Sequence, residues 1–580
     1  MCYPLLFPYG DSGWTTELKK KDGRGNVTQL QWYAYHFAIR DGTFNQFLNA
    51  GKLTHQFMVD AYCKTEANRL NWVRKNQNTI RAEEFDVLQQ FINNRNFMDI
   101  DILPGKKVIL SSTFQGSPRN MAQNYQDAMA MVRKYGKPDL FVTVMCNPKW
   151  KEIKDNLLPN QQPCDRPDLV ARVFNMKLKL LLGDLTTYQR FGRVNGMVYV
   201  IEFQKRGLPH GHILVFMAPE YKAWDKERID KIVCAELPHK DTHPLNPNAP
   251  CMDNGNCTKG FPKDFCSETN SNVNGYPKYQ RRDDNNFVTL GGNKIDNRWV
   301  VPYNPYLSLK YNAHINVEIC SSIQSVKYLF KYIYKGHDCA NIQFVTSATE
   351  QEATIEWDEV KNYIETRYVS APEACWRLRE YKMHHQTDCV ERLNVHLEHK
   401  QTICFTPGKE AEAVQQKNNK SKLLAWFKLN REDPNAQQYL YIEIPEHYTW
   451  DDKNCIWKPR SKGHKTTIGR MFNFSPLERE KYFLRILLLN VKGATSFEDL
   501  RTTDGICFPM FQEACIARGL TDDDSEWDTC LTEAATYQMP IQLRQLFAFI
   551  CILCEPSNAT ALLKGTRQIS WKTIPHVSLM

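Results

Sequence analysis

The sequence lacks long apolar runs, a signal peptide and a phosphate-binding loop, and each absence excludes a class of protein. Its longest apolar stretch, LFAFICILC at residues 546–554, is far shorter than the roughly twenty residues that a membrane-spanning helix needs. The opening MCYPLLFPYG has no charged n-region or cleavage site, so we do not expect secretion. The pattern Gly-x-x-x-x-Gly-Lys-Ser/Thr does not occur, so ATP hydrolysis cannot be assigned to this chain.

The composition is that of a globular protein with several domains. A chain of 580 residues is too long for one hydrophobic core, so two to four domains are expected. The 19 cysteines are odd in number and unevenly spread, which favours reduced thiols in the cytosol or nucleus over a disulfide scaffold. A net charge of +9 permits a nucleic-acid partner without requiring one.

The patterning predicts an α+β protein in three parts. Residues 1–110 are expected to form a helical N-terminal region, and 111–340 a domain built on an antiparallel sheet. Within the second part, 238–310 is rich in Pro, Asn, Gly and Asp and is expected to be an irregular insertion. Residues 341–580 are expected to mix helices and strands, with a strand at QYLYIEI (438–444). The other expected elements are helices within 57–92, 116–136 and 166–185, and strands within 139–150, 197–203 and 212–217.

The stretch MVYVIEFQKRGLPHGHILVFM carries the strongest chemical signal. His210 and His212 are two residues apart on the second expected strand, so both imidazoles project from one face. Glu202 and Gln204 share a face of the first strand and can stand opposite the histidines if the hairpin closes at KRGLP. Two imidazoles and a carboxylate suit Mg²⁺ or Mn²⁺, with open positions for a substrate phosphate. The alternative is that His-x-His only ends a strand.

A second group of metal-binding residue types lies in the irregular insertion. These are His239, His243, Cys251, Cys257 and Cys266. A structural zinc ion could hold such a loop together, but no CxxC pair is present, so unliganded loop cysteines are the alternative.

The stretch SVKYLFKYIYKG (325–336) reads as an amphipathic helix that ends at Gly336. At about 100° per residue, one side carries two tyrosines and two lysines: Tyr328, Tyr332, Lys331 and Lys335. Tyr334 falls at the border of the apolar side, where packing explains it. Nearby ammonium groups favour the phenolate, so the pair are candidate nucleophiles. Two ordinary surface tyrosines are the alternative.

A His-x-His cation site followed by a Tyr-x-x-x-Tyr helix is the equipment of a metal-assisted nickase for single-stranded DNA. The cation would polarise the scissile phosphate, and tyrosine would attack it to leave a 5′-phosphotyrosine and a free 3′-hydroxyl.

The chain resembles the replication-initiator (Rep) part of Helitron transposases, the rolling-circle DNA transposons, especially the plant type. The resemblance runs through almost the whole chain, in CYPLLFPYGDSGW, GSPRNMAQNYQDAMA, PDLFVTVMCNPKW, EFQKRGLPHGHIL, NRWVVPYNPYLSLKYNAHINVE, SVKYLFKYIYKG and LLLNVKGATSFEDLRT. It implies an HUH-endonuclease core, with the metal-binding histidines at His210 and His212 and the nucleophiles at Tyr328 and Tyr332. Glu202, or Gln204 as a substitute, corresponds to the third metal ligand of related viral initiators.

The chain departs from the family pattern in three places. Gly211 stands between the histidines where the family usually has Ala or another apolar residue, which keeps the histidine geometry possible but loosens the strand. A Cys-containing segment before Cys251 is missing, and with it half of any family zinc site. The Pif1-type helicase domain that follows in the family is absent from this chain, which suggests a truncated or degenerate copy.

Three functions follow from these patterns. The first is a Rep nickase and strand transferase acting on the single-stranded ends of a transposon in the nucleus, during rolling-circle replication and DNA recombination. The second is a catalytically inactive, DNA-binding remnant of a Helitron helicase-like protein. The third is an unrelated metal hydrolase. Basic stretches with aromatic residues at 68–77 and 457–470 could follow a DNA backbone, or could simply be solvated faces.

Overall fold

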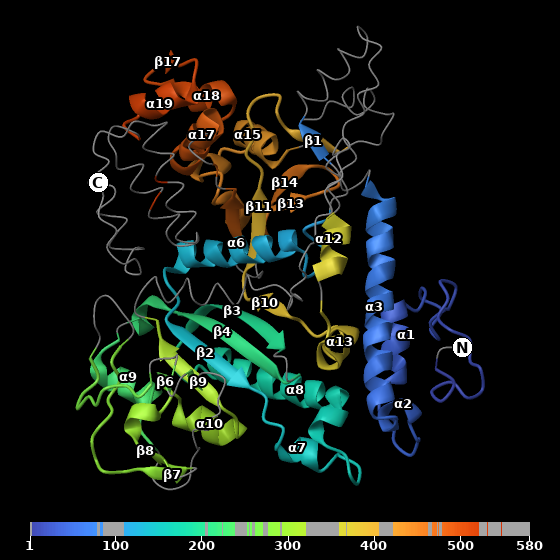
Figure 1. The fold of residues 1–580 in the computed structure, drawn as a ribbon. Coiled ribbons are helices and arrows are strands. Elements are labelled where there is room, and N and C mark those ends of the chain that lie inside the picture. The colour runs from blue at the N-terminus through green and yellow to red at the C-terminus, as the bar shows by residue number, and fades with distance from the viewer. Residues whose placement is uncertain are drawn as a thin grey trace, which may run out of the picture. The chain divides into compact units, whose positions relative to one another are not determined.

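A computed structural model gives the fold. The residues that it describes are 3–77, 82–84, 110–203, 207–237, 252–253, 256–257, 261–270, 277–290, 293–320, 359–404, 421–461, 467–520, 531 and 547, without positions 223, 367, 473 and 475–477. They form an α+β protein of helices and mainly antiparallel sheet (Figure 1). No helix in the described ranges is both long and apolar enough to cross a membrane.

The chain divides into two compact units that interleave along the sequence. The first unit comprises Met1–Trp72, Tyr135–Ser347 and Tyr363–Gln386, and the second Val73–Lys134, Ala348–Asn362 and Thr387–Met580. Helices α3 (Lys52–Lys75) and α12 (Glu359–Thr366) contain residues of both.

The first unit is built on a five-stranded antiparallel sheet in the order β10-β3-β4-β2-β9. The strands are β2 (Leu140–Met145), β3 (Val194–Phe203), β4 (Pro209–Met217), β9 (Ile315–Ile319) and β10 (His384–Gln386), with small pairs β5 (Met252–Asp253)–β6 (Asn256–Cys257) and β7 (Val288–Leu290)–β8 (Asn293–Ile295). The helices are α1 (Gln29–His36), α2 (Gln46–Asn49), α7 (Lys151–Lys154), α8 (Pro167–Thr186), α9 (Lys226–Ile232), α10 (Pro305–Tyr311) and α13 (Ala371–Leu378), with short 3₁₀ turns η1 (Pro163–Asp165), η2 (Pro219–Tyr221) and η3 (Asn297–Trp299).

Helix α8 covers one face of this sheet (Figure 1). It starts at Pro167, whose fixed φ suits the first helical position, and its apolar residues face the sheet. Leu178 and Leu181 are buried there together with Ile213 and Val215 from alternate positions of β4. The expected helix at 166–185 is confirmed as α8, and the hairpin that follows it is confirmed as β3 and β4, whose residues are mostly apolar and buried.

The outer edge of β9 is covered by residues from the expected insertion. The Val317 N–H and the Asn316 side chain both donate to the Pro302 carbonyl, and the Ile319 N–H donates to the Tyr279 hydroxyl. An edge strand with its polar groups occupied in this way cannot pair with another chain.

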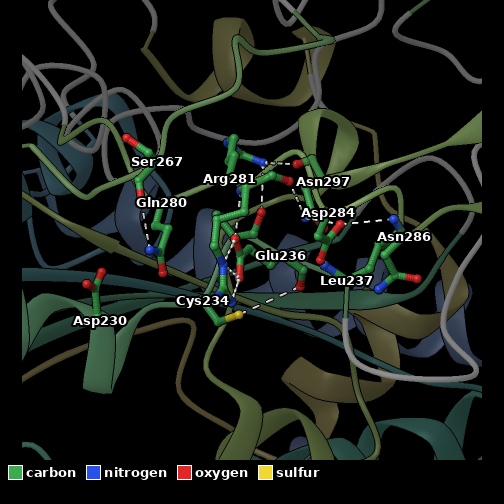
Figure 2. A network of polar contacts seen from close by, with 12 residues as sticks. Asp230, Cys234, Glu236, Leu237, Ser267, Gln280, Arg281, Asp284, Asn286 and Asn297 are labelled. Atoms are coloured by element: carbon green, nitrogen blue, oxygen red, sulfur yellow. Dashed lines mark hydrogen bonds and ion pairs between the residues drawn. The ribbon is translucent and has the colours of Figure 1, made fainter.

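The described part of the insertion is organised around the buried guanidinium of Arg281 (Figure 2). Its Nη1 donates to three main-chain carbonyls, of Ala235 at 3.1 Å, Asn297 at 2.6 Å and Val300 at 2.7 Å. The Asn297 side chain in turn accepts from the Leu237 N–H at 2.7 Å. The bonds to Ala235 and Leu237 join residues 46 and 60 positions apart, so polar contacts order the described part of 238–310, where few apolar residues are available.

The second unit has its own apolar core. Its helices are α6 (Pro118–Tyr135), α15 (Lys422–Glu432), α16 (Ile444–His447), α17 (Arg479–Asn490), α18 (Phe497–Arg501) and α19 (Phe511–Ala517), with the 3₁₀ turn η4 (Ala436–Gln438). Its strand pairs are β1 (Ala82–Glu84)–β12 (Thr402–Cys404), parallel β11 (Cys389–Leu393)–β15 (Thr467–Met471), β13 (Tyr448–Asp451)–β14 (Ile456–Pro459) and β16 (Thr502–Thr503)–β17 (Ile506–Cys507). The expected helix at 116–136 is confirmed as α6.

The strand expected at 438–444 is wrong. The segment forms turns that lead into α16, where Pro445 occupies an early helical position. The Leu440 N–H donates to the Glu443 carboxylate at 2.8 Å, which closes a local turn in place of a strand ladder. Tyr441 and Ile444 are buried, three residues apart, a spacing that suits a turn or helix better than the two-residue period of a strand.

Candidate metal and DNA-processing site

The histidine hairpin forms as strands β3 and β4. Gly207 in the connection has φ 81°, a left-handed conformation that glycine adopts without strain. The register pairs Glu202 with His210, and it pairs Val200 with His212. Directly paired residues of antiparallel strands project from the same side, so Glu202, His210 and His212 share one face of the sheet. This is the face opposite α8.

His210 is held as a neutral imidazole. It is 4% exposed, and its Nδ1 lies 3.1 Å from the Leu208 carbonyl oxygen. Burial, followed by the positive charge of His212, lowers the pKa of His210 to about 4. Nδ1 therefore carries the proton that is donated to Leu208, and the lone pair is on Nε2. That atom is buried and has no hydrogen-bond partner among the described residues, which is the state of a nitrogen ready to bind a cation.

His212 lies between a hydroxyl and a carboxylate. Its Nδ1 is 3.1 Å from Thr143 Oγ1 on β2, and its Nε2 is 3.4 Å from Glu202 Oε2. Its ring also stacks on Phe141, with centroids 5.9 Å apart and planes at 12°. Two tautomers fit these contacts: Nε2–H donating to Glu202 while Thr143 donates to Nδ1, or Nδ1–H donating to Thr143, which would present the Nε2 lone pair to a cation beside Glu202.

The donor atoms, and the distance between His212 Nε2 and Glu202 Oε2, fit a divalent cation. Two ligands about 2.1 Å from one ion and at a right angle lie about 3.0 Å apart, close to the 3.4 Å between His212 and Glu202. Across the described ranges, no three His, Cys, Asp or Glu side chains are grouped so as to hold a metal ion. His212 and Glu202 thus form one close donor pair, and His210 offers a third donor on the same face.

Position 211 is enclosed on the α8 side of the sheet. A Cβ atom there would lie 3.0 Å from Val144 Cγ1 and 3.5 Å from both Ile201 Cδ1 and Leu178 Cδ1. An alanine would require Val144 to shift by a few tenths of an ångström. Glycine at 211 therefore permits close packing of the strand on α8, which differs from the loosening expected from the sequence.

Several predicted site residues lie outside the described part of the chain. They are Gln204, Tyr328, Lys331, Tyr332 and Lys335, together with His239, His243 and Cys251 of the suggested zinc group. Of that group, Cys266 is described, and its thiol donates to the Glu268 carbonyl at 2.8 Å.

Two residues near the site were missed by sequence reasoning. Thr143 is the one hydroxyl in the apolar run LFVTVM, and that interruption was a usable signal. His314 directly precedes β9, and its charge contributes to the lowered pKa of His210. Nothing local in the sequence places it there, because its position depends on pairing between distant strands.

Comparison with known families agrees with this part of the fold. Residues 32–215 match the family described as the Helitron helicase-like domain at the N-terminus. The matched range includes β2, α8 and the hairpin with both histidines, and it ends before His314 and the two tyrosines. No curated protein matches the chain. Residues 32–215 of this chain are therefore similar to the Helitron helicase-like N-terminal domain.

Proposed function

We propose that the chain is a Helitron-type Rep protein of the HUH class, which nicks single-stranded DNA and transfers the strand through a 5′-phosphotyrosine. The observation that carries the proposal is the register that pairs Glu202 with His210 and sets His212 3.4 Å from the same carboxylate. We assign the nickase domain to residues 111–340 and its setting to rolling-circle transposition in the nucleus.

The cation would be Mg²⁺ or Mn²⁺, held by His210, His212 and Glu202, with Gln204 as a further candidate. When bound, it supplies Lewis-acid polarisation of the scissile phosphate. The Leu208 carbonyl accepts from His210 Nδ1, and with a cation bound Thr143 would accept from His212 Nδ1, so that both imidazoles would present Nε2. The mixed nitrogen and oxygen donor set, on a face whose His210 is neutral at pH 7, supports this assignment.

The nucleophile would be Tyr328 or Tyr332. Its hydroxyl loses a proton, its oxygen bonds to phosphorus, and the bond from phosphorus to the 3′-oxygen breaks. The phosphoryl group stays on the 5′ end of the downstream strand, and the released 3′-oxygen takes up a proton. Lys331 and Lys335, on the same helical side, would favour the phenolate. Attack by a free 3′-hydroxyl on the phosphotyrosine reverses these changes and joins two strands.

Binding of single-stranded DNA without cleavage is the second candidate. The observation that favours it is that no three potential ligands of the described residues are grouped around a common point.

The test is a covalent-adduct assay. The protein is incubated with a randomised pool of end-labelled single strands and Mn²⁺ or Mg²⁺, and denatured samples are separated by size. The nickase predicts a labelled adduct that requires the cation and is lost in His210→Ala, His212→Ala and Tyr328→Phe/Tyr332→Phe, while His399→Ala, at an exposed histidine, retains it. Binding without an adduct would favour the second candidate, and cation-dependent cleavage without an adduct would indicate a metal hydrolase.

A further inference from the structure

The turn before β9 is fixed by side chains from the segment that follows β2. The Asn147 side chain donates to the Asn312 carbonyl at 2.7 Å. The buried Trp150 indole N–H donates to the carbonyls of Tyr311 at 2.7 Å and Asn312 at 3.0 Å. Asn312 itself adopts the left-handed conformation that ends α10. The main chain two residues before His314 is therefore held firmly to the central sheet.

His314 continues the row of residues that contains the candidate cation site. Strand β2 lies between β4 and β9, and its last residue, Met145, pairs with His210. The Met145 N–H donates to the His314 carbonyl at 3.0 Å, one step beyond the pairing of Val144 with Ile315. The register therefore orders Glu202, His210, Met145 and His314 across one end of the sheet, on one face.

The position of His314 suits a contact with substrate better than a place among the ligands. Two strand spacings separate its backbone from that of His210, roughly 9.6 Å. Its side chain is exposed, whereas His210 is buried. An imidazole N–H on the solvent side of the row can donate to an anionic oxygen without losing much hydration.

We propose that His314 binds a backbone phosphate of the single-stranded DNA next to the scissile phosphate. This inference rests on the proposed nickase function and adds the direction of the bound strand, which would run across the sheet end from Glu202 towards β9. The phosphate is the ligand because it is the anion that recurs along a single strand at every nucleotide, whatever its sequence. His314 would hold the strand in register and take no part in the bond changes.

The test uses the strand that forms the adduct with the wild-type protein, identified from the randomised pool. Binding is measured in the Tyr328→Phe/Tyr332→Phe background, so that the strand stays intact. Loss of a hydrogen bond to a charged group predicts about ten- to hundredfold weaker binding for His314→Ala. His314→Gln, which keeps an N–H donor, is expected to lose less, and His399→Ala is the matched control at an exposed histidine.

A phosphate scan separates contact from structural damage. Single phosphates around the cleavage point are replaced by uncharged methylphosphonates. At one position, the methylphosphonate should weaken binding to the protein that retains His314 by about tenfold. The same methylphosphonate should not weaken binding to His314→Ala any further, because both changes remove the same contact. Penalties that add at every position would overturn the inference, as would unchanged binding by both variants. If His314→Ala does not fold, His314→Phe, which keeps a ring but has no N–H donor, takes its place in the cycle. If the wild type forms the adduct but the His314 variants bind DNA as tightly as their background, the role of His314 is refuted and the nickase proposal stands. If the wild type forms no adduct, the nickase proposal and the role of His314 are both refuted.

Discussion

The burial of neutral His210 makes a quantitative prediction about stability and pH. The pKa of this imidazole is about 4 in the folded protein against 6.5 for an exposed histidine. The unfolded chain therefore binds a proton more readily, so acid favours unfolding. The stability contributed by this difference is fully present above pH 6.5 and is lost as the pH falls towards 4. Linkage gives a loss of about 2 kcal/mol at pH 5 and about 3.4 kcal/mol below pH 4.

The measurement is urea unfolding with EDTA present, from about pH 7.5 to pH 4.5. The matched variant is His210→Asn, whose side-chain amide can still donate to the Leu208 carbonyl. Histidines distant from this site contribute equally to both proteins, so the difference between the two curves reports His210 together with its coupling to His212 and His314. We expect the advantage of the wild type to shrink by about 2 kcal/mol at pH 5. A difference that stays constant across this range would refute the burial of a neutral imidazole at this position.

Three further predictions follow from contacts in the first unit. Trp150→Phe removes an indole N–H from two main-chain carbonyls, so the free energy of unfolding should fall by about 1–3 kcal/mol in urea titrations; an unchanged midpoint would contradict the role of this bond. Thr143→Val removes the partner of His212 Nδ1, so Mn²⁺ affinity by calorimetry should fall about 10–100-fold with little change in thermal stability, and equal affinity would argue against Thr143 as a positioning residue. Arg281→Met leaves three carbonyls without their donor, so limited proteolysis should cut near this residue much faster than in the wild type, and an unchanged cleavage pattern would show that these bonds do not order the segment.

Much of the central sheet could be predicted from local patterns. The continuous apolar runs of the hairpin and the helical period at 166–185 predict buried strands and a helix packed by one face, and the two-residue spacing places His210 and His212 on a shared face. The segment QYLYIEI shows the limit of this reasoning. It is rich in the aromatic and branched residues that favour strands, but Pro445 and the Glu443 side chain favour local turns.

The rest of the site depends on pairings between distant parts of the chain. Strand β10 (His384–Gln386) joins the sheet beside β3 although nearly two hundred residues separate them, and β9 joins beside β2 in the same way. No local period encodes such partners, because their energies are realised only when the chain has closed a long loop. For this reason Thr143 was visible as an interruption in its strand, whereas the relation of His314 to His210 was not.

The proposed nickase function requires that Tyr328 or Tyr332, in the segment 325–336, becomes covalently bound to DNA when a cation is present. The most direct measurement is mass spectrometry of the adduct after trypsin digestion. Cleavage after lysine separates YLFK, which carries Tyr328, from YIYK, which carries Tyr332 and Tyr334. We expect DNA linked through its 5′-phosphate to Tyr328 or Tyr332, in a reaction that requires Mn²⁺ or Mg²⁺ and is absent in His210→Ala. An adduct on Tyr334, one that forms equally in His210→Ala, or cleaved DNA with no modified tyrosine would contradict it.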